Sequence, residues 1–398
     1  MAASAVGTKG VVTSVGAPDV VRPLQGVTTG ILAIVAVLLA LSIVMSASTG
    51  PAWNPAQTRF NVLKQMLWLV VSALALFLAY SFDYRKLRRF SVLLLLLSLA
   101  SLAGVLYFGA KVNGARRWYR VSDFLSIQPS EFFKVVLCFY MADFLAREQE
   151  RIKTFFKGFF QPMLIMGVAF ILILKQPDLG TAILIAVVTF GMLFVAGIRL
   201  IHVMPAVLAS VPLVAYTIIY VPYRLQRILA FLNPWADPQG TGYQIIQSLI
   251  ALGSGGPYGV GLGNSTQKLL YLPEANNDFI FAIIGEELGL NGCGIVILLF
   301  ALLFRYGLRV ARHAPDLFGS LLAFGLTFTI GLEAVVNIAV VTCSAPTKGL
   351  ALPLVSSGGS SLVATMAAVG LIMNVASQVE ADALPADLGA VKVSGRSS

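Results

Sequence analysis

The apolar positions of this chain gather into long, unbroken runs separated by short polar connectors. About 20 apolar residues are enough for a helix to cross the hydrocarbon core of a bilayer. A helix also pairs its own backbone groups, as lipid requires. The ten predicted spans are 27–47, 62–80, 90–109, 131–146, 159–175, 180–197, 201–222, 279–304, 317–342 and 359–377. The pattern therefore predicts an all-α polytopic membrane protein with about ten transmembrane helices.

The longest connection, residues 222–277, joins the seventh predicted span to the eighth and is too long to be expected without structure. Within it, residues 224–232 and 243–252 place apolar side chains at helical spacing beside polar ones. This spacing predicts two amphipathic helices lying along the membrane surface. The segment 240–263 is rich in glycine, which allows either close approach of the backbone to a ligand or tight turns within the protein.

Composition supports the membrane interpretation, because 58% of the residues are hydrophobic and only 12% are charged. Soluble domains carry about 25% charged residues. The three cysteines form no C-x-x-C pair and neither histidine neighbours one, which argues against a zinc-type site. The net charge of +10 would suggest nucleic acid in a soluble protein. In a membrane protein we expect no nucleic-acid partner. The excess of positive charge is explained first by membrane topology and by binding of anionic lipids.

The basic residues of short connectors predict how the chain is oriented, because Lys and Arg collect on the cytoplasmic side. The second, fourth and eighth connectors are basic and fall on one side of a ten-span arrangement, together with both termini. Their basic residues are Arg85, Lys86, Arg88, Arg89, Arg147, Arg151, Lys153, Lys157, Arg305, Arg309 and Arg312. We therefore expect a protein of the cytoplasmic (inner) membrane with a disordered cytoplasmic tail at 1–25, a membrane domain at 26–378 and a cytoplasmic tail at 379–398. Loop 222–277 would then be extracytoplasmic.

The opposite, outer side carries more cations than orientation requires. They either scatter there without a shared role or bind an anionic group such as a phosphate. The cations in question include Arg116, Arg117, Lys175, Arg224, Arg227, Lys268 and Lys348.

Several ionisable residues also fall within or beside the predicted spans, where each costs roughly 2.5–3.5 kcal/mol on insertion scales. Glu131 and Lys134 are three residues apart, so they face the same side of a helix and can pair. Each such group serves either a function or a buried structural ion pair. Asp278 is the least easily explained as structural, because it lies at the mouth of a span with no cation within a turn. The other groups are Lys175 with Asp178, Glu274, Glu286 with Glu287, and Glu333 with Asn337.

A series of motifs resembles the FtsW/RodA/SpoVE family, also called SEDS, over about residues 26–378 and in the same order. They are GARRW at 114–118, IQPSE at 127–131, KQPDLGT at 175–181, FLNPWADPQGTGYQ at 231–244, GLGNSTQK at 261–268, LPEA at 272–275, DFIFA at 278–282, EELG at 286–289, PTKG at 346–349 and SSGGSS at 356–361. The LPEA motif and the N-terminal extension are more similar to the family's division members than to its elongation members. Two stretches depart from the family pattern: Asn276 and Asn277 stand where His and Thr are usual, and Ser357 replaces an aromatic residue.

The resemblance implies a peptidoglycan glycosyltransferase that polymerises lipid II on the outer face of the cytoplasmic membrane, at the division septum. It implies a class B penicillin-binding transpeptidase and other membrane proteins of the division machinery as partners. Asp278 matches the family's catalytic aspartate and is predicted to be the general base. The predicted substrate-binding residues are Arg116, Arg117, Lys175, Asp178, Lys268, Glu274 and Lys348, and the predicted intramembrane charges are Glu131, Lys134, Glu286 and Glu333.

Other functions and a metal cofactor stay open at this point. A transporter that flips lipid II would also use intramembrane charges, and a scaffold that recruits the transpeptidase would need no catalytic residue. A divalent cation, Mg²⁺ or Mn²⁺, could share the charge of the diphosphate. Glu131, Asp178 and Glu274 are conceivable ligands, although no metal-specific spacing supports them.

Overall fold

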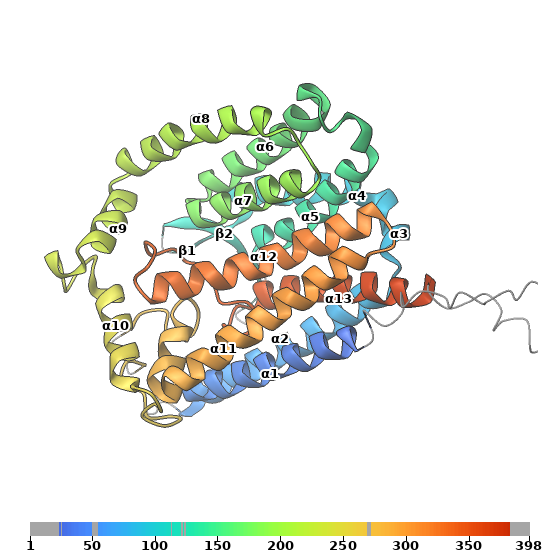
Figure 1. The fold of residues 1–398 in the computed structure, drawn as a ribbon. Helices are drawn as coiled ribbons and strands as arrows, with labels where there is room; N and C mark the ends of the chain where they lie inside the picture. The colour runs from blue at the N-terminus through green and yellow to red at the C-terminus, as the bar shows by residue number, and fades with distance from the viewer. Residues whose placement is uncertain are drawn as a thin grey trace, which may run out of the picture.

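The computed structural model describes residues 24, 26–49, 55–112, 114–120, 122, 125–268 and 272–382 as one bundle of long helices (Figure 1). Of the predicted N-terminal tail at 1–25, only Leu24 is among the described residues. The predicted C-terminal tail begins within the last helix, and the chain after Asp382 lies outside the described residues. Ten helices of the bundle each overlap one predicted span. They are α1 Val27–Ser48, α2 Pro55–Ser81, α4 Ser91–Phe108, α5 Pro129–Arg147, α6 Gln161–Lys175, α7 Leu179–Val195, α8 Leu200–Ile219, α11 Ile280–His313, α12 Leu317–Val341 and α13 Gly359–Asp382.

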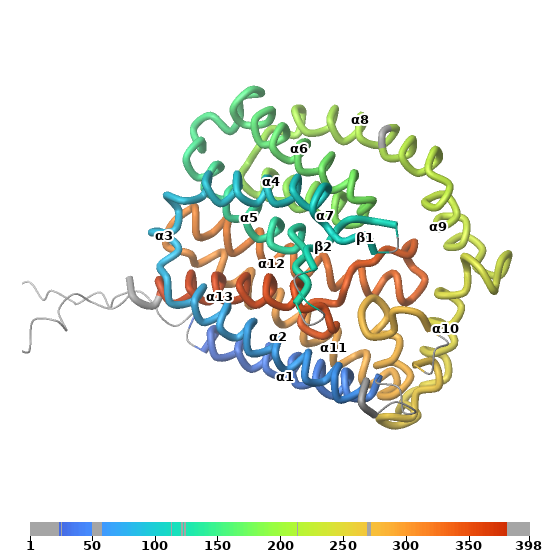
Figure 2. Tube along the Cα trace, turned by 180° about the vertical axis from the view of Figure 1, so that it is seen from behind, coloured from blue at the N-terminus to red at the C-terminus, as the bar shows by residue number. Residues whose placement is uncertain are grey.

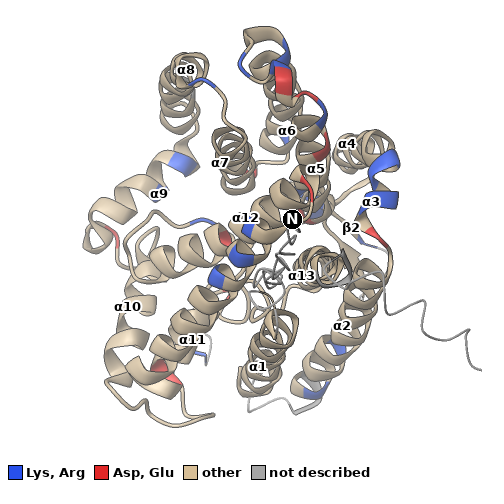
Figure 3. Ribbon diagram, turned by 45° about the vertical axis from the view of Figure 1, so that its right-hand side comes forward, with Lys and Arg blue, Asp and Glu red and all other residues tan. Residues whose placement is uncertain are grey.

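The prediction of a polytopic all-α membrane protein is confirmed. Within the described ranges, eight helical stretches are long and apolar enough to cross a membrane. Helix α7 is apolar but shorter, and α5 carries the charges that lower its hydropathy. The Lys, Arg, Asp and Glu positions fall mostly in loops and near helix ends, and most of each helix body carries none (Figure 3).

Two predicted boundaries were wrong at one end of the bundle. Helix α11 ends at His313 rather than at 304, so the three arginines assigned to a connector lie on its last turns. Arginine is favourable there, because its positive charge complements the partial negative charge at the C-terminal end of the helix dipole. Its long side chain also lets the guanidinium reach the aqueous boundary of the membrane. Helix α13 likewise continues to Asp382, past the predicted end at 377.

The predicted amphipathic helices are both present. They are α9 Pro222–Leu232 and α10 Tyr243–Gly255, joined through the short helix η4 Pro234–Ala236. Together with α8 they form an arc around one edge of the bundle (Figure 1). Helix α8 packs mainly against α9 and the short π-helix η3 Phe155–Phe160, and none of the residues whose burial is described in its most apolar stretch is buried.

A small antiparallel sheet was not predicted. Strand β2 Ala115–Arg120 pairs with β1 Ala110–Val112 on one side and with β3 Ser126–Ile127 on the other. These strands are too short to show an alternating pattern in the sequence. The sheet covers the ends of α4 and α5. The end of the bundle that carries the sheet, α9 and α10 is called the mouth below.

The centre of the bundle is formed by α5, α12 and α13, and α13 packs closely along α2 (Figure 2). The remaining short helices, α3 Tyr84–Leu87, η1 Arg88–Phe90 and η2 Gln149–Arg151, lie in connectors at the end opposite the mouth. The chain enters α5, α11 and α13 at the mouth, so the loops that precede these helices meet there.

The glycine-rich segment packs backbone to backbone against α11. Gly289, with φ 67°, kinks that helix, and a Cβ added at Gly259 would lie 2.1 Å from the Glu287 carbonyl oxygen. The amide nitrogens of Val260 and Leu290 donate hydrogen bonds across the contact, to Glu286 and Gly256. At this contact the glycines therefore serve close packing within the protein, which was the structural alternative left open by the sequence.

Candidate active site

Asp278 lies at the mouth in a tight turn that leads into α11. Glu274 has φ 56°, and its carbonyl accepts hydrogen bonds from the amides of Asn277 at 3.0 Å and Phe279 at 3.3 Å. The Glu274 carboxylate accepts from the side-chain amide of Asn277 at 2.9 Å. The turn places the Asp278 carboxyl half-buried at the start of a rigid helix.

Burial raises the pKa of Asp278 from its ordinary 3.8 to about 7, and the charge of Glu274 adds to this rise. The guanidinium groups of Arg227 and Arg117 oppose it, and Asp178 reinforces it. A carboxyl with this pKa is largely ionised just above neutral pH yet remains basic enough to accept a proton from a reacting hydroxyl. The structure thus gives Asp278 the property expected of a general base.

Arg117 is the arginine of the GARRW motif that lies toward Asp278. Its guanidinium donates to the carbonyls of Gln176 at 2.8 Å and Pro177 at 2.5 Å, in the connection between α6 and α7. Successive residues of a strand point to opposite faces, so Arg116 is directed elsewhere. It is exposed and donates to the carbonyls of Leu106 and Tyr107 at 3.2 Å each. Of the two predicted arginines, only Arg117 is brought to Asp278.

Lys348 is carried by the connection between α12 and α13. Burial lowers its pKa, and the nearby charge of Asp178 opposes that change. The neighbouring Gly349 lies directly against the catalytic candidate, because an added Cβ would stand 3.0 Å from Oδ2 of Asp278. A lysine whose ammonium is partly desolvated gains from an incoming anion, so Lys348 remains a suitable partner for a phosphate.

Asp178 has a local structural role that the sequence did not reveal. Its carboxylate caps the first turn of α7 and accepts from the Thr181 amide at 3.1 Å and from the Thr181 hydroxyl at 2.9 Å. Such caps stabilise helix ends. Its charge still reaches Asp278 and Lys348, so it shapes the electrostatics of the mouth from a fixed position.

Sequence reasoning did not assign Arg227 or Asn337 to the site. Arg227, on α9, donates to the Thr347 carbonyl at 3.1 Å and lies over the Tyr223 ring at 4.5 Å. Asn337, on α12, donates to the carbonyls of Asp278 at 2.8 Å and Leu350 at 2.7 Å. The polar face of α9 and the intramembrane position of Asn337 were visible signals, but neither indicated the partner.

Lys268 and Glu286 lie in a separate network behind the turn. Lys268 pairs with Glu287 at 3.1 Å and donates to the Ser48 hydroxyl of α1 at 3.2 Å. Glu286 accepts from the Thr266 amide at 2.9 Å and from the Ser265 hydroxyl. Both predicted residues therefore hold the 263–268 segment in place, and the structure does not bring them to Asp278. Lys175 is exposed at the end of α6.

Glu131, Lys134 and Glu333 form a buried cluster that joins α5 to α12. The Lys134 ammonium lies 2.8 Å from Glu131 Oε2, which confirms the pairing predicted from their spacing. It also pairs with Glu333, which is 199 residues away in the chain. A small cavity lies beside the cluster and is lined in part by Thr329 and Thr365. Two carboxylates thus share one ammonium inside the bundle.

The three carboxylates considered as metal ligands are engaged separately: Glu131 with Lys134, Asp178 with Thr181 and Glu274 with Asn277. In the part of the chain that the structure describes, no three His, Cys, Asp or Glu side chains gather as a metal site would require. The residues present do not fit a protein-held divalent ion, and a metal requirement stays a prediction.

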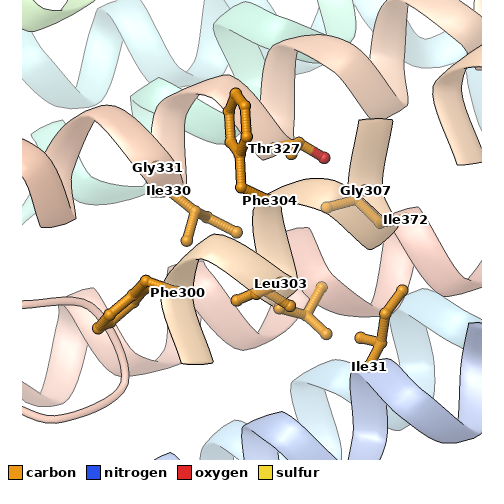
Figure 4. Close-up of a pocket in the computed structure, with 10 residues that line it drawn as sticks. Ile31, Phe300, Leu303, Phe304, Gly307, Thr327, Ile330, Gly331 and Ile372 are labelled. Carbon is orange, nitrogen blue, oxygen red and sulfur yellow. The ribbon is translucent and has the colours of Figure 1, made fainter. Parts of the chain in front are cut away.

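A second cavity lies between α1, α11, α12 and α13, and its wall is apolar except for the Thr327 hydroxyl (Figure 4). Its lining includes Ile31, Phe300 and Ile372, and it shares no residue with the group around Asp278. We interpret it as a packing space between helices.

The fold and the mouth define a multi-pass membrane protein with a half-buried carboxylate set among cations at one end. A family model described as a cell cycle protein, FtsW/RodA/SpoVE, matches residues 28–381. The chain therefore belongs to the FtsW/RodA/SpoVE family. It is 44% identical over 350 residues to the probable peptidoglycan glycosyltransferase FtsW of Trichlorobacter lovleyi, covering 87% of this chain and 92% of that protein. It is 41% identical over 343 residues to the stage V sporulation protein E of Bacillus subtilis, covering 85% and 93%.

Two solved structures share the fold. One is a chain of a peptidoglycan synthase complex described as coordinating polymerization and crosslinking, with a TM-score of 0.74, 30% identity and coverage of 88% of this chain and 98% of that one. The other is the rod shape determining protein RodA of Thermus thermophilus, with a TM-score of 0.66, 28% identity and coverage of 88% and 96%.

Proposed function

We propose that this protein is a peptidoglycan glycosyltransferase that polymerises lipid II into glycan strands, with Asp278 as its general base. The relatives named above support the activity. The observation that carries the catalytic assignment is the Asp278 carboxyl, whose pKa is raised to about 7 at a mouth supplied with Arg117, Arg227 and Lys348.

The reaction joins an acceptor sugar hydroxyl to the anomeric carbon of a donor sugar linked to undecaprenyl diphosphate. Asp278 takes the proton of the hydroxyl as the new carbon–oxygen bond forms. The bond from the anomeric carbon to the diphosphate oxygen breaks, and the diphosphate leaves with the electron pair. Cations held in place before the reaction stabilise this developing charge. Arg117, Arg227 and Lys348 are the residues we assign to that role.

We place the mouth at the outer face of the cytoplasmic membrane and both termini in the cytoplasm. The basic connectors at the opposite end of the bundle support this orientation. The amphipathic helices α9 and α10 would then lie at the membrane surface, beside the head group of a lipid substrate.

We further propose that the protein works at the division septum with a class B penicillin-binding transpeptidase and other division proteins. The family's description as a cell cycle protein and the resemblance to a chain of a synthase complex support this proposal. Polymerised strands would pass directly to the crosslinking partner.

The test uses the purified protein with its transpeptidase partner and lipid II, and follows glycan polymer by gel electrophoresis. We expect Asp278→Ala to abolish polymer and Asp278→Glu to leave a small residual rate. Polymer made by Asp278→Ala at the wild-type rate would remove the general base. A wild-type protein that makes no polymer but scrambles lipid II between leaflets would be a transporter, and one that only recruits the transpeptidase would be a scaffold.

A further inference from the structure

The backbone of the Asp278 turn is held by three hydrogen bonds to three successive carbonyls. The carbonyl of Asn276 accepts from the Ser357 amide at 3.1 Å, and that of Asn277 accepts from the Ser356 hydroxyl at 2.6 Å. The carbonyl of Asp278 accepts from the Asn337 side chain at 2.8 Å. The donors come from α12 and from the segment before α13. These hydrogen bonds therefore connect the turn before α11 to α12 and to the α12–α13 connection.

Asn337 makes the central connection in this set. Its side chain is 1% exposed, and its amide nitrogen donates both to Asp278 and, at 2.7 Å, to the Leu350 carbonyl. Only a side chain with two N–H donors on one nitrogen can bind two carbonyls in this way. The Asn337 Oδ1 accepts no hydrogen bond from the described residues. The two donated bonds are therefore its only polar contacts there.

We propose that Asn337 is a positioning residue that sets the distance between the Asp278 carboxylate and the segment carrying Lys348. This inference rests on the proposed role of Asp278 as general base. By holding the carbonyls of Asp278 and Leu350 on one nitrogen, Asn337 keeps Gly349 against the carboxylate. That contact is tight, because an added Cβ at Gly349 would lie 3.0 Å from Asp278 Oδ2.

Loss of the Asn337 amide removes one hydrogen bond from the Asp278 turn and one from the segment that carries Lys348. The base would then move relative to the cation, although neither side chain is altered. Misplacement of a reacting group by about 1 Å can cost on the order of 100-fold in rate. Lys348 keeps its charge in these variants, and Arg117, which also serves binding, is held by Gln176 rather than by Asn337. Most of the effect is therefore expected in kcat rather than in KM.

The experiment measures lipid II polymerisation by the full-length protein with its partner for Asn337→Asp and Asn337→Leu. The first variant keeps the shape of the side chain without the two donors, and the second keeps the volume without polarity. We expect kcat to fall by about 10- to 100-fold with KM within about threefold. The midpoint of the acid limb of the pH–rate profile should also move, because the surroundings of the Asp278 carboxyl change.

Ser248→Ala is the matched control. Ser248, on α10, is fully buried, and its hydroxyl donates to the Val341 carbonyl of α12 at 2.7 Å rather than to a carbonyl of the Asp278 turn. This change removes a comparable buried hydrogen bond, so thermal stability should fall. Its kcat and pH profile should stay at the wild-type values.

A second variant keeps the inference testable if both Asn337 variants fail to fold. Ser356→Ala removes the hydroxyl that donates to Asn277 and accepts from the Leu352 amide at 2.8 Å. It should lower kcat by about 3- to 10-fold, since one of the three bonds to the turn is lost. In the Asp278→Glu background, which keeps a small residual rate, Asn337→Asp should cause a smaller loss than in the wild type, because residues that act as one unit are not additive.

The outcomes separate the two proposals. An unchanged kcat and pH profile in Asn337→Asp, or in Ser356→Ala where that variant is used, would overturn the positioning role if Asp278→Ala is inactive. Wild-type polymerisation by Asp278→Ala would instead remove the general base on which the inference rests.

Discussion

At the scale of single residues, the chemistry of Asp278 comes from its surroundings. The residue was visible in the sequence as a carboxylate at the mouth of a span. Its raised pKa comes from burial and from Glu274 four residues earlier, and arginines from a strand and from α9 oppose the rise. Of these neighbours, sequence spacing shows only Glu274, because Arg117 and Arg227 reach the turn through tertiary structure. This is why Asp278 stood out in the sequence as a candidate, whereas Arg227 was only one of several outer cations.

Asp278→Asn should stabilise the protein increasingly as pH rises. The folded pKa is about 7 and the ordinary value is 3.8, so the folded state holds a proton that the unfolded state has lost between these values. Wild-type stability therefore declines as pH rises from about 4 to about 7 and levels off above that. The asparagine variant avoids this loss, by about 2 kcal/mol between pH 5 and pH 8. Thermal unfolding in detergent at both pH values measures the difference.

The control for this prediction is Asp237→Asn. Asp237 is exposed, and hydrogen bonds from Thr241 and Gly240 lower its pKa, so its contribution to stability is present at high pH and is lost as pH falls. Both test pH values lie above the ordinary pKa of 3.8, so its replacement should cost the same at pH 5 and pH 8 and show no pH trend. Equal pH trends in the two variants would contradict the burial argument for Asp278.

Arg117 and Arg116 offer a matched pair for the diphosphate. Arg117→Ala should weaken lipid II binding by about tenfold or more, since hydrogen bonds to charged groups contribute about 1.5–3 kcal/mol. Arg116→Ala should change it by less than twofold, because Arg116 lies on the other face of β2. Lys348→Ala should resemble Arg117→Ala. Equilibrium binding of fluorescent lipid II in nanodiscs checks this, and equal affinities for both arginine variants would remove Arg117 from the diphosphate site.

At the scale of elements, long apolar runs predicted the spans well because lipid imposes length and apolarity on each helix. The errors lie where that constraint ends. Helix α11 continues beyond the apolar run through three arginines, and the strands around GARRW are held by pairing with each other rather than by a pattern of their own. Short elements of this kind depend on neighbours that a single sequence does not reveal.

The contact between the glycine-rich segment and α11 can be tested at one position. Gly259→Ala should destabilise the protein by more than about 2 kcal/mol, because the residue has φ 81° and its Cβ would collide with the Glu287 carbonyl. Gly253→Ala lies in α10 with open space around it and should stabilise the protein by about 0.5–1 kcal/mol. Thermal midpoints of the two purified variants decide this. Similar midpoints would mean that the backbone at Gly259 can shift to accommodate a Cβ without loss of stability.

At the scale of the whole molecule, the mouth is assembled from segments far apart in the chain. The bond from Asn337 to Asp278 spans 59 residues and that from Arg227 to Thr347 spans 120. The two departures from the family pattern also meet here, since the Ser357 amide binds the Asn276 carbonyl and its hydroxyl lies 3.0 Å from that of Ser46. The sequence indicated which motifs matter, and the fold determines which of them touch.

The proposed orientation can be measured with cysteine variants in a background where Cys138, Cys293 and Cys343 are replaced by alanine. Gln239→Cys lies in an exposed connection at the mouth and Lys153→Cys in an exposed one at the opposite end. A membrane-impermeant maleimide should label the first in intact spheroplasts. It should label the second only after the membrane is opened. The reverse result would place both termini outside the cytoplasm.

The buried cluster of Glu131, Lys134 and Glu333 also constrains how the chain is made. Glu131 and Lys134 enter the membrane together on α5, whereas Glu333 follows 199 residues after Lys134. At about 5–20 residues per second, α12 emerges roughly 10–40 s after α5. During that interval the α5 surface that receives Glu333 has to stay open to an arriving helix. Biogenesis of this protein therefore includes a waiting period, and its length is set by the speed of translation.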